Sequence, residues 1–329
     1  MIKSLEHIKG LWATVGKNEK LSIYINIPFC MCQCRYCLYK GVQGKTEDEK
    51  RRFVYDYLIP AIKRFHDVFE QHEIETIYFG GGTPNAIPME MIFDICDATG
   101  CFERAENKIL EAHPAFCDAE AAEMLIKYGF TLITFGVQSF DEESLKLQKR
   151  PYCSPEKIKE MADRIHEYGG KISIDLMCYL KSYAQSDLEV FKKDVELTKQ
   201  TGVDFATIYP ELNLILNDEA ARQGFIEAIK SIDFGDYYLD DSVLDVEGNP
   251  RSITRMIKSN YSYEEFSKKI LPYYGNDFPY AQQNIVAFGD GGSKQEVMSY
   301  SPRKFFYTEK NVGASKPFYN VRYEDGKAQ

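Results

Sequence analysis

Strand-like and helix-like segments alternate through the first two thirds of the chain, and this alternation is the strongest constraint on its fold. Six short, largely apolar runs are each followed by a segment with helical character. Such alternation is typical of parallel strands joined by right-handed crossover helices. The predicted strands are Leu21–Ile27, Ile74–Phe79, Lys108–Ala112, Thr131–Phe135, Lys171–Met177 and Val203–Tyr209.

The segments between these strands have the period of amphipathic helices. The first, residues 46–71, opens on Thr46-Glu-Asp-Glu49, which has the form of a capping box. No G-x-G-x-x-G follows the first predicted strand, which disfavours a nucleotide-binding open sheet. We therefore predict an α/β fold, a partial parallel (β/α)6 TIM-like barrel. Further helices are expected near residues 89–97, 118–128, 142–148, 155–168 and 188–201.

The alternation weakens after about residue 212, and the predicted domain boundary lies there. A helix is expected near residues 217–231, followed by an acidic, tyrosine-rich turn at Asp236–Asp241 and irregular sequence. We assign residues 1–212 to the barrel and residues 213–329 to a short C-terminal α/β module. The aromatic residues of this module predict that it covers the barrel mouth, on the substrate side.

Charge and hydropathy disfavour two classes of partner. The formal net charge is −10 and the pI is about 5.2, whereas broad nucleic-acid binding needs clustered Lys and Arg. The first residues lack the apolar core of a secretory signal, and no run approaches the roughly 18 apolar residues of a membrane span. We expect a cytoplasmic protein that binds neither nucleic acid nor membrane.

Four of the nine cysteines crowd into Cys30-Met-Cys32-Gln-Cys34-Arg-Tyr-Cys37. An odd number of cysteines with this clustering favours a metal site over a disulfide framework. Cys30, Cys34 and Cys37 follow a strand on one short loop and can hold three corners of a 4Fe-4S cubane, which leaves one iron open. The alternatives are a zinc site with Cys32 as fourth ligand, or unligated buried cysteines. In the cluster hypothesis Cys32 is a bystander.

A glycine-rich segment leaves the end of the second predicted strand. In a parallel barrel the carboxyl ends of the strands form the face that carries active sites, and Gly80-Gly-Gly-Thr-Pro84 lies there. Without Cβ atoms the backbone can approach a small polar group such as an ammonium, and Pro84 restricts the exit of the loop. Taken alone, three glycines are more typical of a tight turn than of a site.

The spacing C-x3-C-x2-C resembles the signature of the radical SAM superfamily. In that superfamily the open iron is chelated by S-adenosylmethionine (SAM), and an electron from the cluster cleaves SAM to methionine and a 5′-deoxyadenosyl radical. Five ordered motifs within residues 21–212 further resemble the oxygen-independent coproporphyrinogen III oxidase family. This family includes decarboxylating oxidases, haem chaperones, haem-degrading enzymes and two-SAM methylases. The motifs are Tyr24–Cys30, Phe79–Pro84, Glu111–Pro114, Phe135–Asp141 with Arg150, and Ile174–Leu176.

The resemblance implies a set of SAM contacts. Tyr24 and Phe29 match positions beside the cluster. Carboxylates can accept bonds from ribose hydroxyls, and arginine can bind a carboxylate bidentately. Each polar residue of the set also has a structural interpretation, as half of an ion pair or as a loop cap. Gly81, Gly82 and Thr83 match the segment at the methionine moiety, and Glu111, Gln138, Arg150 and Asp175 match the residues around the SAM carboxylate and ribose.

Two departures from the family pattern bear on the reaction. Cys178-Tyr-Leu-Lys181 stands where the family usually has Tyr-Gly-Leu-Pro, so we expect a different turn and a different resting place for a second SAM or a substrate. Leu38-Tyr39-Lys40 stands where the oxidases have a further cysteine. Both departures argue against tetrapyrrole decarboxylation.

We therefore expect an oxygen-sensitive radical enzyme with a 4Fe-4S cluster, one SAM and room for a second, reduced by a flavodoxin- or ferredoxin-type electron donor. Its substrate is a small molecule or peptide, and methyl transfer is the first expectation. A one-SAM decarboxylating or dehydrogenating oxidase and a non-catalytic haem-trafficking protein remain open. His113 is expected to be a packed loop residue. No auxiliary cluster is expected from the scattered Cys96, Cys101, Cys117, Cys153 and Cys178, which form no C-x2-C pair.

Overall fold

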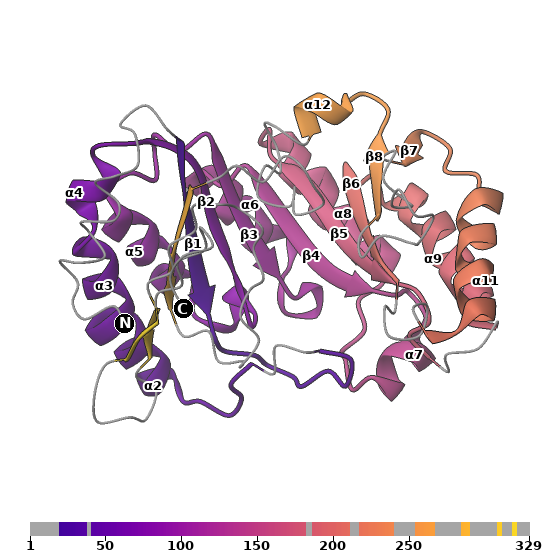
Figure 1. The fold of residues 1–329 in the computed structure, drawn as a ribbon, viewed down its shortest axis with the longest axis horizontal. Coiled ribbons are helices and arrows are strands. Elements are labelled where there is room, and N and C mark those ends of the chain that lie inside the picture. Colours follow the sequence, from indigo (N-terminus) through magenta and orange to yellow (C-terminus); the bar gives the residue numbers. More distant parts are fainter. Residues whose placement is uncertain are drawn as a thin grey trace. The chain divides into compact units, whose positions relative to one another are not determined.

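The computed structural model describes residues 20–37, 41–181, 186–210, 217–239, 254–266, 284–289, 308–310 and 318–320. These residues belong to two compact units. The first unit contains residues 20–31, residues 41–111 and the described segments from residue 284 on. The second contains residues 32–37 and the described segments between residues 112 and 266. Figure 1 shows the elements of both units, coloured along the sequence.

The first unit has four neighbouring parallel strands: β1 (Lys20–Ile27), β2 (Glu73–Gly81), β3 (Asn107–Ala112) and β9 (Asn284–Gly289). Their order is β3, β2, β1, β9, and every pairing is parallel. The predicted strands for β1, β2 and β3 are thus confirmed within two residues at each end. β9 comes from the C-terminal third of the chain, where no strand is predicted.

Helices cover this sheet on the side to the left of β1 in Figure 1. In β9, Phe288 packs edge-on against Phe65 and Phe69, with ring centroids 5.2 and 6.0 Å away. The apolar core of the unit therefore lies between its sheet and these helices. The helical elements are α2 (Glu47–Arg52), the π-helical η1 (Phe53–Leu58), α3 (Ile59–Lys63), α4 (His66–Phe69), the 3-10 turn η2 (Pro84–Ala86) and α5 (Met89–Thr99).

The predicted helix over residues 46–71 is helical but interrupted. Its start is as predicted, because the Thr46 hydroxyl accepts from the Glu49 amide at 3.3 Å and Glu49 accepts from the Thr46 amide at 2.9 Å. The π-helical η1 and a turn at residues 64–65 break the α-helical pattern further on. Pro60 accounts for the first irregularity, since it lacks the backbone N–H that an α-helix would use there.

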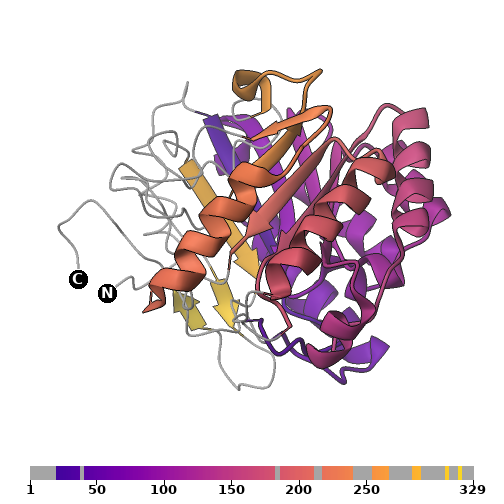
Figure 2. The same cartoon turned by 90° about the vertical axis from the view of Figure 1, so that its right-hand side faces the viewer.

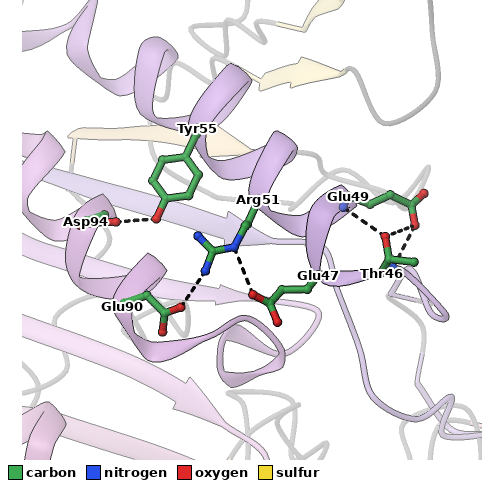
Figure 3. Close-up of polar contacts among 7 residues, drawn as sticks. All are labelled: Thr46, Glu47, Glu49, Arg51, Tyr55, Glu90 and Asp94. Carbon is green, nitrogen blue, oxygen red and sulfur yellow. Dashed lines mark hydrogen bonds and ion pairs between the residues drawn. The ribbon is translucent and has the colours of Figure 1, made fainter.

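Side chains connect this helical segment to α5 (Figure 3). Arg51 contacts Glu47, one turn earlier, and Glu90 of α5, each at 3.1 Å. The Tyr55 hydroxyl donates to Asp94 of α5 at 2.5 Å. Exposed pairs of this kind stabilise little by themselves. They link α2 and η1 to α5.

The second unit has three parallel strands and two antiparallel ones. β8 runs antiparallel to β6, and β7 runs antiparallel to β8, so the order is β4, β5, β6, β8, β7. The predicted strands for β4, β5 and β6 are confirmed, with ends that differ by up to three residues. The strands are β4 (Leu132–Gln138), β5 (Lys171–Met177), β6 (Phe205–Tyr209), β7 (Tyr237–Leu239) and β8 (Thr254–Lys258).

Helices of the second unit pack side by side along the chain: α6 on α8, α8 on α9 and α9 on α11. Figure 2 looks onto α11, which lies in front of the strands of this unit. Asp118, Ser154 and Asp218 cap the amino ends of α6, α8 and α11 through their side-chain oxygens. The elements are η3 (Pro114–Phe116), α6 (Ala119–Tyr128), α7 (Glu142–Leu147), α8 (Pro155–Glu167), α9 (Ser186–Thr201), α11 (Glu219–Ser231) and α12 (Tyr263–Glu265).

The C-terminal third contributes strands to both units. β8 pairs with β6, β9 pairs with β1, and β10 (Thr308–Lys310) pairs antiparallel with β11 (Phe318–Asn320). The turn predicted at residues 236–241 is wrong for Tyr237–Leu239, which form β7, whereas Asp236 lies in a turn. Tyr237 is buried and its hydroxyl donates to the Val203 carbonyl at 2.5 Å, which holds this segment against the unit. Of the helices in the described ranges, none has the length and apolar character of a membrane span.

One buried carboxylate joins several elements at the amino ends of β5 and β6. Asp204 accepts from the Ile172 amide and from His166 Nε2, both at 2.9 Å, and from the Tyr261 hydroxyl at 3.1 Å. These partners come from β5, from α8 and from the turn after β8. The amino face of a parallel barrel is where such contacts serve stability.

We expect Asp204→Ala to lower the free energy of unfolding by about 2–4 kcal/mol, because it leaves buried donors unpaired. Tyr261→Phe removes one of these bonds and should cost about 1 kcal/mol. Urea unfolding followed by far-UV circular dichroism measures both. Equal losses in the two variants would show that the carboxylate does not act as a shared acceptor.

Candidate functional site

The predicted site residues divide between the two units, and each set is described by itself. In the first unit the loop after β1 is held by backbone bonds to residue 42. The Cys30 amide donates to the Val42 carbonyl at 2.9 Å, and the Val42 amide donates to the Pro28 carbonyl at 2.7 Å. The Phe29 ring is buried against Phe53, edge-on with centroids 5.2 Å apart. Phe29 therefore anchors the loop through packing.

The glycine segment at the end of β2 lies directly against the cysteine loop. The Gly82 amide donates to the Ile27 carbonyl at 2.8 Å, and a Cβ on Gly82 would stand 2.7 Å from the Phe29 carbonyl oxygen. Gly81 has φ +107°, which other residues rarely adopt. The Thr83 hydroxyl lies 3.5 Å from Cys30 Sγ and also donates to the Gly82 carbonyl. The structure thus brings Cys30, Gly82 and Thr83 together.

Glu111 is held by a tyrosine that the sequence analysis did not single out. The Tyr78 hydroxyl donates to Glu111 Oε1 at 2.5 Å, and Tyr78 stacks on Tyr24 with ring centroids 5.7 Å apart. The register of β1 on β2 sets Tyr24 opposite Tyr78. The signal in the sequence is the strand period, since two tyrosines on paired parallel strands face the same side when they are in register.

In the second unit the segment 32–37 is fastened to the end of α7. The Arg35 amide donates to the Gln148 carbonyl at 3.0 Å. Beyond α7, Lys149 adopts φ +56° and the Arg150 amide donates back to the Leu145 carbonyl at 2.9 Å, the pattern of a Schellman turn. This turn directs Arg150 to the cysteine segment.

Arg150 Nη1 lies 3.3 Å from Cys34 Sγ, and Nη2 donates to the Gly136 carbonyl. Cys34 is buried, with 7% of its surface exposed, and its sulfur lies 3.8 Å from that of Cys32. The Cys32 thiol as hydrogen-bond donor, together with the Arg150 guanidinium, lowers the pKa of Cys34 to about 5 against the opposing effect of burial. These neighbours favour the thiolate of Cys34, which is the form that binds metals.

Gln138 and Asp175 lie on the neighbouring strands β4 and β5. The register sets Asp175 opposite Gly136 and Leu176 opposite Gln138, with an irregularity between the two pairs. Gln138 adopts φ +71°. A Cβ on Gly136 would stand 2.8 Å from Gln138 Nε2 and 2.9 Å from Arg150 Nη2, so both side chains lie over this glycine. Within the second unit, Cys34, Gln138 and Arg150 are thus brought together, with Asp175 on the adjacent strand.

Asp194 of α9, which the sequence analysis did not single out, holds the loop after β4. It accepts from the Ser139 hydroxyl at 2.6 Å and from the Phe140 amide at 2.8 Å, and 2% of its surface is exposed. Burial raises the pKa of Asp194 to about 7, although both hydrogen bonds oppose the rise. The signal in the sequence is an aspartate at an apolar position of the helix period, between Phe191 and Val195.

The turn after β5 keeps a conformation suited to glycine. Tyr179, which stands where the family has glycine, adopts φ +61°. The buried Tyr179 ring and the bond from its hydroxyl to the Ala221 carbonyl at 2.7 Å offset the strain of this backbone conformation. That the turn differs from that of the family stays a prediction. Because lysine stands where the family has proline, residue 181 keeps a backbone amide. This amide donates to the Asp187 carboxylate at 3.1 Å.

The five scattered cysteines and His113 take no part in the contacts described above. The five scattered cysteines are buried, and burial raises the pKa of Cys117 to about 12 and that of Cys153 to about 11. His113 is buried, and burial lowers its pKa to about 3. Its Nδ1 accepts from the Ala115 amide at 3.2 Å, as for a packed loop residue. In the described segments, no three His, Cys, Asp or Glu side chains are gathered as they are around a bound metal ion.

Residues 24–195 match the radical SAM superfamily, which is more than half of the chain. The chain therefore belongs to the radical SAM superfamily. Heme chaperone HemW of Haemophilus influenzae is 30% identical over 136 residues, 40% of this chain and 36% of that protein. The oxygen-independent coproporphyrinogen III oxidase of Helicobacter pylori is 23% identical over 319 residues, 93% of this chain and 64% of that protein. The chain spans about half the length of the curated relatives it matches.

The solved structure of coproporphyrinogen III oxidase (HemN) from Escherichia coli has the same fold. Its TM-score is 0.63 at 18% identity, with 79% of this chain and 60% of that chain covered. The predicted fold class, α/β with a parallel sheet of the partial-barrel type, is thereby confirmed. The predicted resemblance to the coproporphyrinogen oxidase-like relatives is confirmed as well.

Gly82→Ala should displace the cysteine loop, because the new Cβ would meet backbone carbonyls of Phe29 and Pro28 at 2.7 and 2.8 Å. Overpacking of this kind costs roughly 1–3 kcal/mol, and we expect the variant to retain less iron after anaerobic reconstitution. Gly169→Ala is the control for lost stability alone, because Gly169 has φ +77° but its Cβ would meet no atom within 4 Å, so this variant should keep its iron. Equal iron contents in the two variants would contradict this account.

Asp194 should make stability depend on pH. Its pKa is about 7 in the folded protein against 3.8 ordinarily, so the folded state holds the proton more tightly than the unfolded state. Its contribution to stability is fully present below about pH 4 and is lost as the pH rises toward about 7. Relative to Asp194→Asn, the wild-type free energy of unfolding should fall by about 4 kcal/mol over this window, at about 1.4 kcal/mol per pKa unit. Urea unfolding at several pH values measures the difference, which would stay constant if the carboxyl were not protonated at neutral pH.

Proposed function

We propose that the chain is a radical SAM enzyme that holds a 4Fe-4S cluster on Cys30, Cys34 and Cys37 and cleaves SAM at the open iron. The observation that carries this proposal is the loop of three thiols with C-x3-C-x2-C spacing inside the segment that matches the superfamily. When bound, the cluster with SAM supplies a 5′-deoxyadenosyl radical that removes a hydrogen atom from the substrate.

The donor set of this loop fits an iron–sulfur cluster. Thiolates are the usual ligands of such clusters, and the eight-residue segment from Cys30 to Cys37 is short enough for its three sulfurs to reach one cubane. Two of the sulfurs have polar neighbours, Thr83 at Cys30 and Arg150 at Cys34. Hydrogen bonds to ligand sulfurs tune the reduction potential of a cluster and orient its ligands.

Arg150 also supports the proposed SAM contact. Its Nε is buried and has no hydrogen-bond partner among the described residues. A buried guanidinium donor without an acceptor is costly, and a carboxylate would satisfy it with a charge-assisted bond. We propose that the SAM carboxylate occupies this position. The Gly81–Thr83 backbone would receive the SAM amino group, and Glu111, Gln138 and Asp175 would bind the ribose.

Methyl transfer to a small molecule or peptide is our first proposal for the reaction. The stretches Leu38–Lys40 and Cys178–Lys181 depart from the oxidase pattern and argue against decarboxylation. The second candidate is haem trafficking without turnover, which is supported by the relatives named heme chaperone HemW. A one-SAM oxidase is supported by the relative that matches most of the chain, the coproporphyrinogen III oxidase. A cytoplasmic location and a flavodoxin- or ferredoxin-type electron donor belong to the same proposal.

Reconstitution with iron and sulfide under anaerobic conditions should load about four irons per chain. Dithionite and SAM should then release 5′-deoxyadenosine. Cys30→Ala, Cys34→Ala and Cys37→Ala should each abolish this cleavage, whereas Cys32→Ala should retain it. Zinc in the purified protein, or cleavage by any of the three ligand variants, would overturn the proposal.

Products separate the three reactions. A second SAM used for methyl transfer releases S-adenosylhomocysteine, so this product should accumulate beside 5′-deoxyadenosine during turnover with substrate. If 5′-deoxyadenosine forms without S-adenosylhomocysteine, the reaction is that of a one-SAM oxidase. Stoichiometric binding of haem, seen as a Soret band, without SAM cleavage would establish haem trafficking instead.

A further inference from the structure

Cys32 is the one clustered cysteine that the proposed cluster does not use, and it lies against a proposed ligand. Its sulfur is 3.8 Å from that of Cys34. Among the described residues of the second unit, no other sulfur is in hydrogen-bonding contact with Cys34. Arg150 Nη1, at 3.3 Å, also contacts the Cys34 sulfur. Cys32 and Cys34 thus form a pair of thiols for which the proposed cluster chemistry gives no reason.

The backbone of this segment allows the two sulfurs to be joined. Residues that are two positions apart have Cα atoms at most about 7 Å apart, and a disulfide spans Cα separations of roughly 4.4–6.8 Å. The chain bends at Met31 and Cys32, and Gln33 between the two cysteines is exposed. An S–S bond is about 2.05 Å long, so the sulfurs must approach by about 1.8 Å from their present 3.8 Å. The partly exposed Cys32 side chain can make this movement.

The two sulfurs differ in their access to solvent. Cys32 is partly exposed, whereas 7% of the surface of Cys34 is exposed. A dissolved oxidant therefore meets Cys32 first. A sulfenic acid without a neighbouring thiol is oxidised further to a sulfinic acid, which is generally irreversible, whereas a neighbouring thiol converts it to a disulfide. Cys34 is placed to be that neighbour.

We propose that Cys32 and Cys34 form a reversible disulfide when the iron-free protein meets peroxide. Peroxide oxidises the Cys32 thiol to a sulfenic acid and releases one water. The Cys34 sulfur then attacks the Cys32 sulfur: the S–S bond forms, the S–O bond breaks, and the hydroxyl leaves as a second water with the Cys34 proton. Both sulfurs are oxidised and the peroxide is reduced.

This inference rests on the proposed function, because the disulfide withholds one of the three proposed cluster ligands. With Cys34 bound to Cys32, only Cys30 and Cys37 remain, and a cluster lacks its third thiolate. The disulfide also keeps Cys34 from irreversible oxidation. Strained or exposed disulfides are the more easily reduced ones, so thiol reductants return Cys34 to the form that can bind iron.

The test uses the full chain, stripped of iron, reduced, and then treated with a stoichiometric amount of hydrogen peroxide. Free thiols are alkylated after denaturation, and trypsin releases the peptide from Leu21 to Arg35, which holds Cys30, Cys32 and Cys34. Tandem mass spectrometry should find the alkyl label on Cys30 and no label on the other two. Dithiothreitol added before alkylation should restore the label to all three. Iron loading should be lost after peroxide and regained after dithiothreitol.

Two serine variants separate the pair from general oxidation. Cys32→Ser should load iron as the wild type does before oxidation, which shows that it folds. After peroxide, Cys34 should keep its label in this variant, because its partner is gone and burial shields it. Cys153→Ser is the matched control, since Cys153 is also buried and lies outside the cysteine segment. It should form the disulfide as the wild type does.

The position of the label decides the inference. Label kept on Cys34 in the oxidised wild type overturns it, and so does a disulfide from Cys34 to Cys30 or Cys37. Equal loss of the Cys34 label in the wild type and in Cys32→Ser overturns it as well. Reduced wild-type protein that loads no cluster overturns the proposed function instead, and the label then still shows whether the disulfide forms.

Discussion

The parallel pairing of β1 with β2 is the contact on which the first unit depends. Its register sets Ile27 opposite Gly81, so the cysteine loop and the glycine segment leave the sheet at the same edge. The bond from the Gly82 amide to the Ile27 carbonyl continues this ladder beyond the last strand residue. A side chain at residue 82 would meet the loop carbonyls, so glycine is required there by packing before any ligand is considered.

In the second unit the short helix α7 has a comparable role. Asp141 caps its amino end through the Ser144 amide at 2.8 Å, and the buried Asp194 holds the loop that leads into it. At its other end, the carbonyl of Gln148 accepts from the Arg35 amide. The turn that follows places Arg150 beside Cys34. Loop, helix and turn follow one another along the chain, and the buried Asp194 carboxyl holds the first of them through Ser139 and Phe140.

Much of the fold was predictable, because apolar periodicity and helix caps are local properties. The six parallel strands, the capping box at Thr46 and the N-cap at Asp118 all follow from neighbours in the sequence. Three elements were not predicted from the sequence. β7 and β9 depend on distant partner strands, and the π-helical segment depends on Pro60 within a helix. Tyr179 shows the limit most clearly: its left-handed backbone is tolerated because the ring is buried and bonded to α11.

The sequence by itself determined the chemistry that the chain can support: three cysteines at a particular spacing, a glycine segment after a strand and a set of polar residues at strand ends. These are covalent and local facts. Tertiary structure alone decided that Tyr78 orients Glu111, that Asp194 holds the loop behind Gln138, and that Arg150 lies against the sulfur of Cys34. Such contacts join residues about 30 to more than 110 positions apart, and no local pattern encodes them, because their energy arises only when burial removes the competing water.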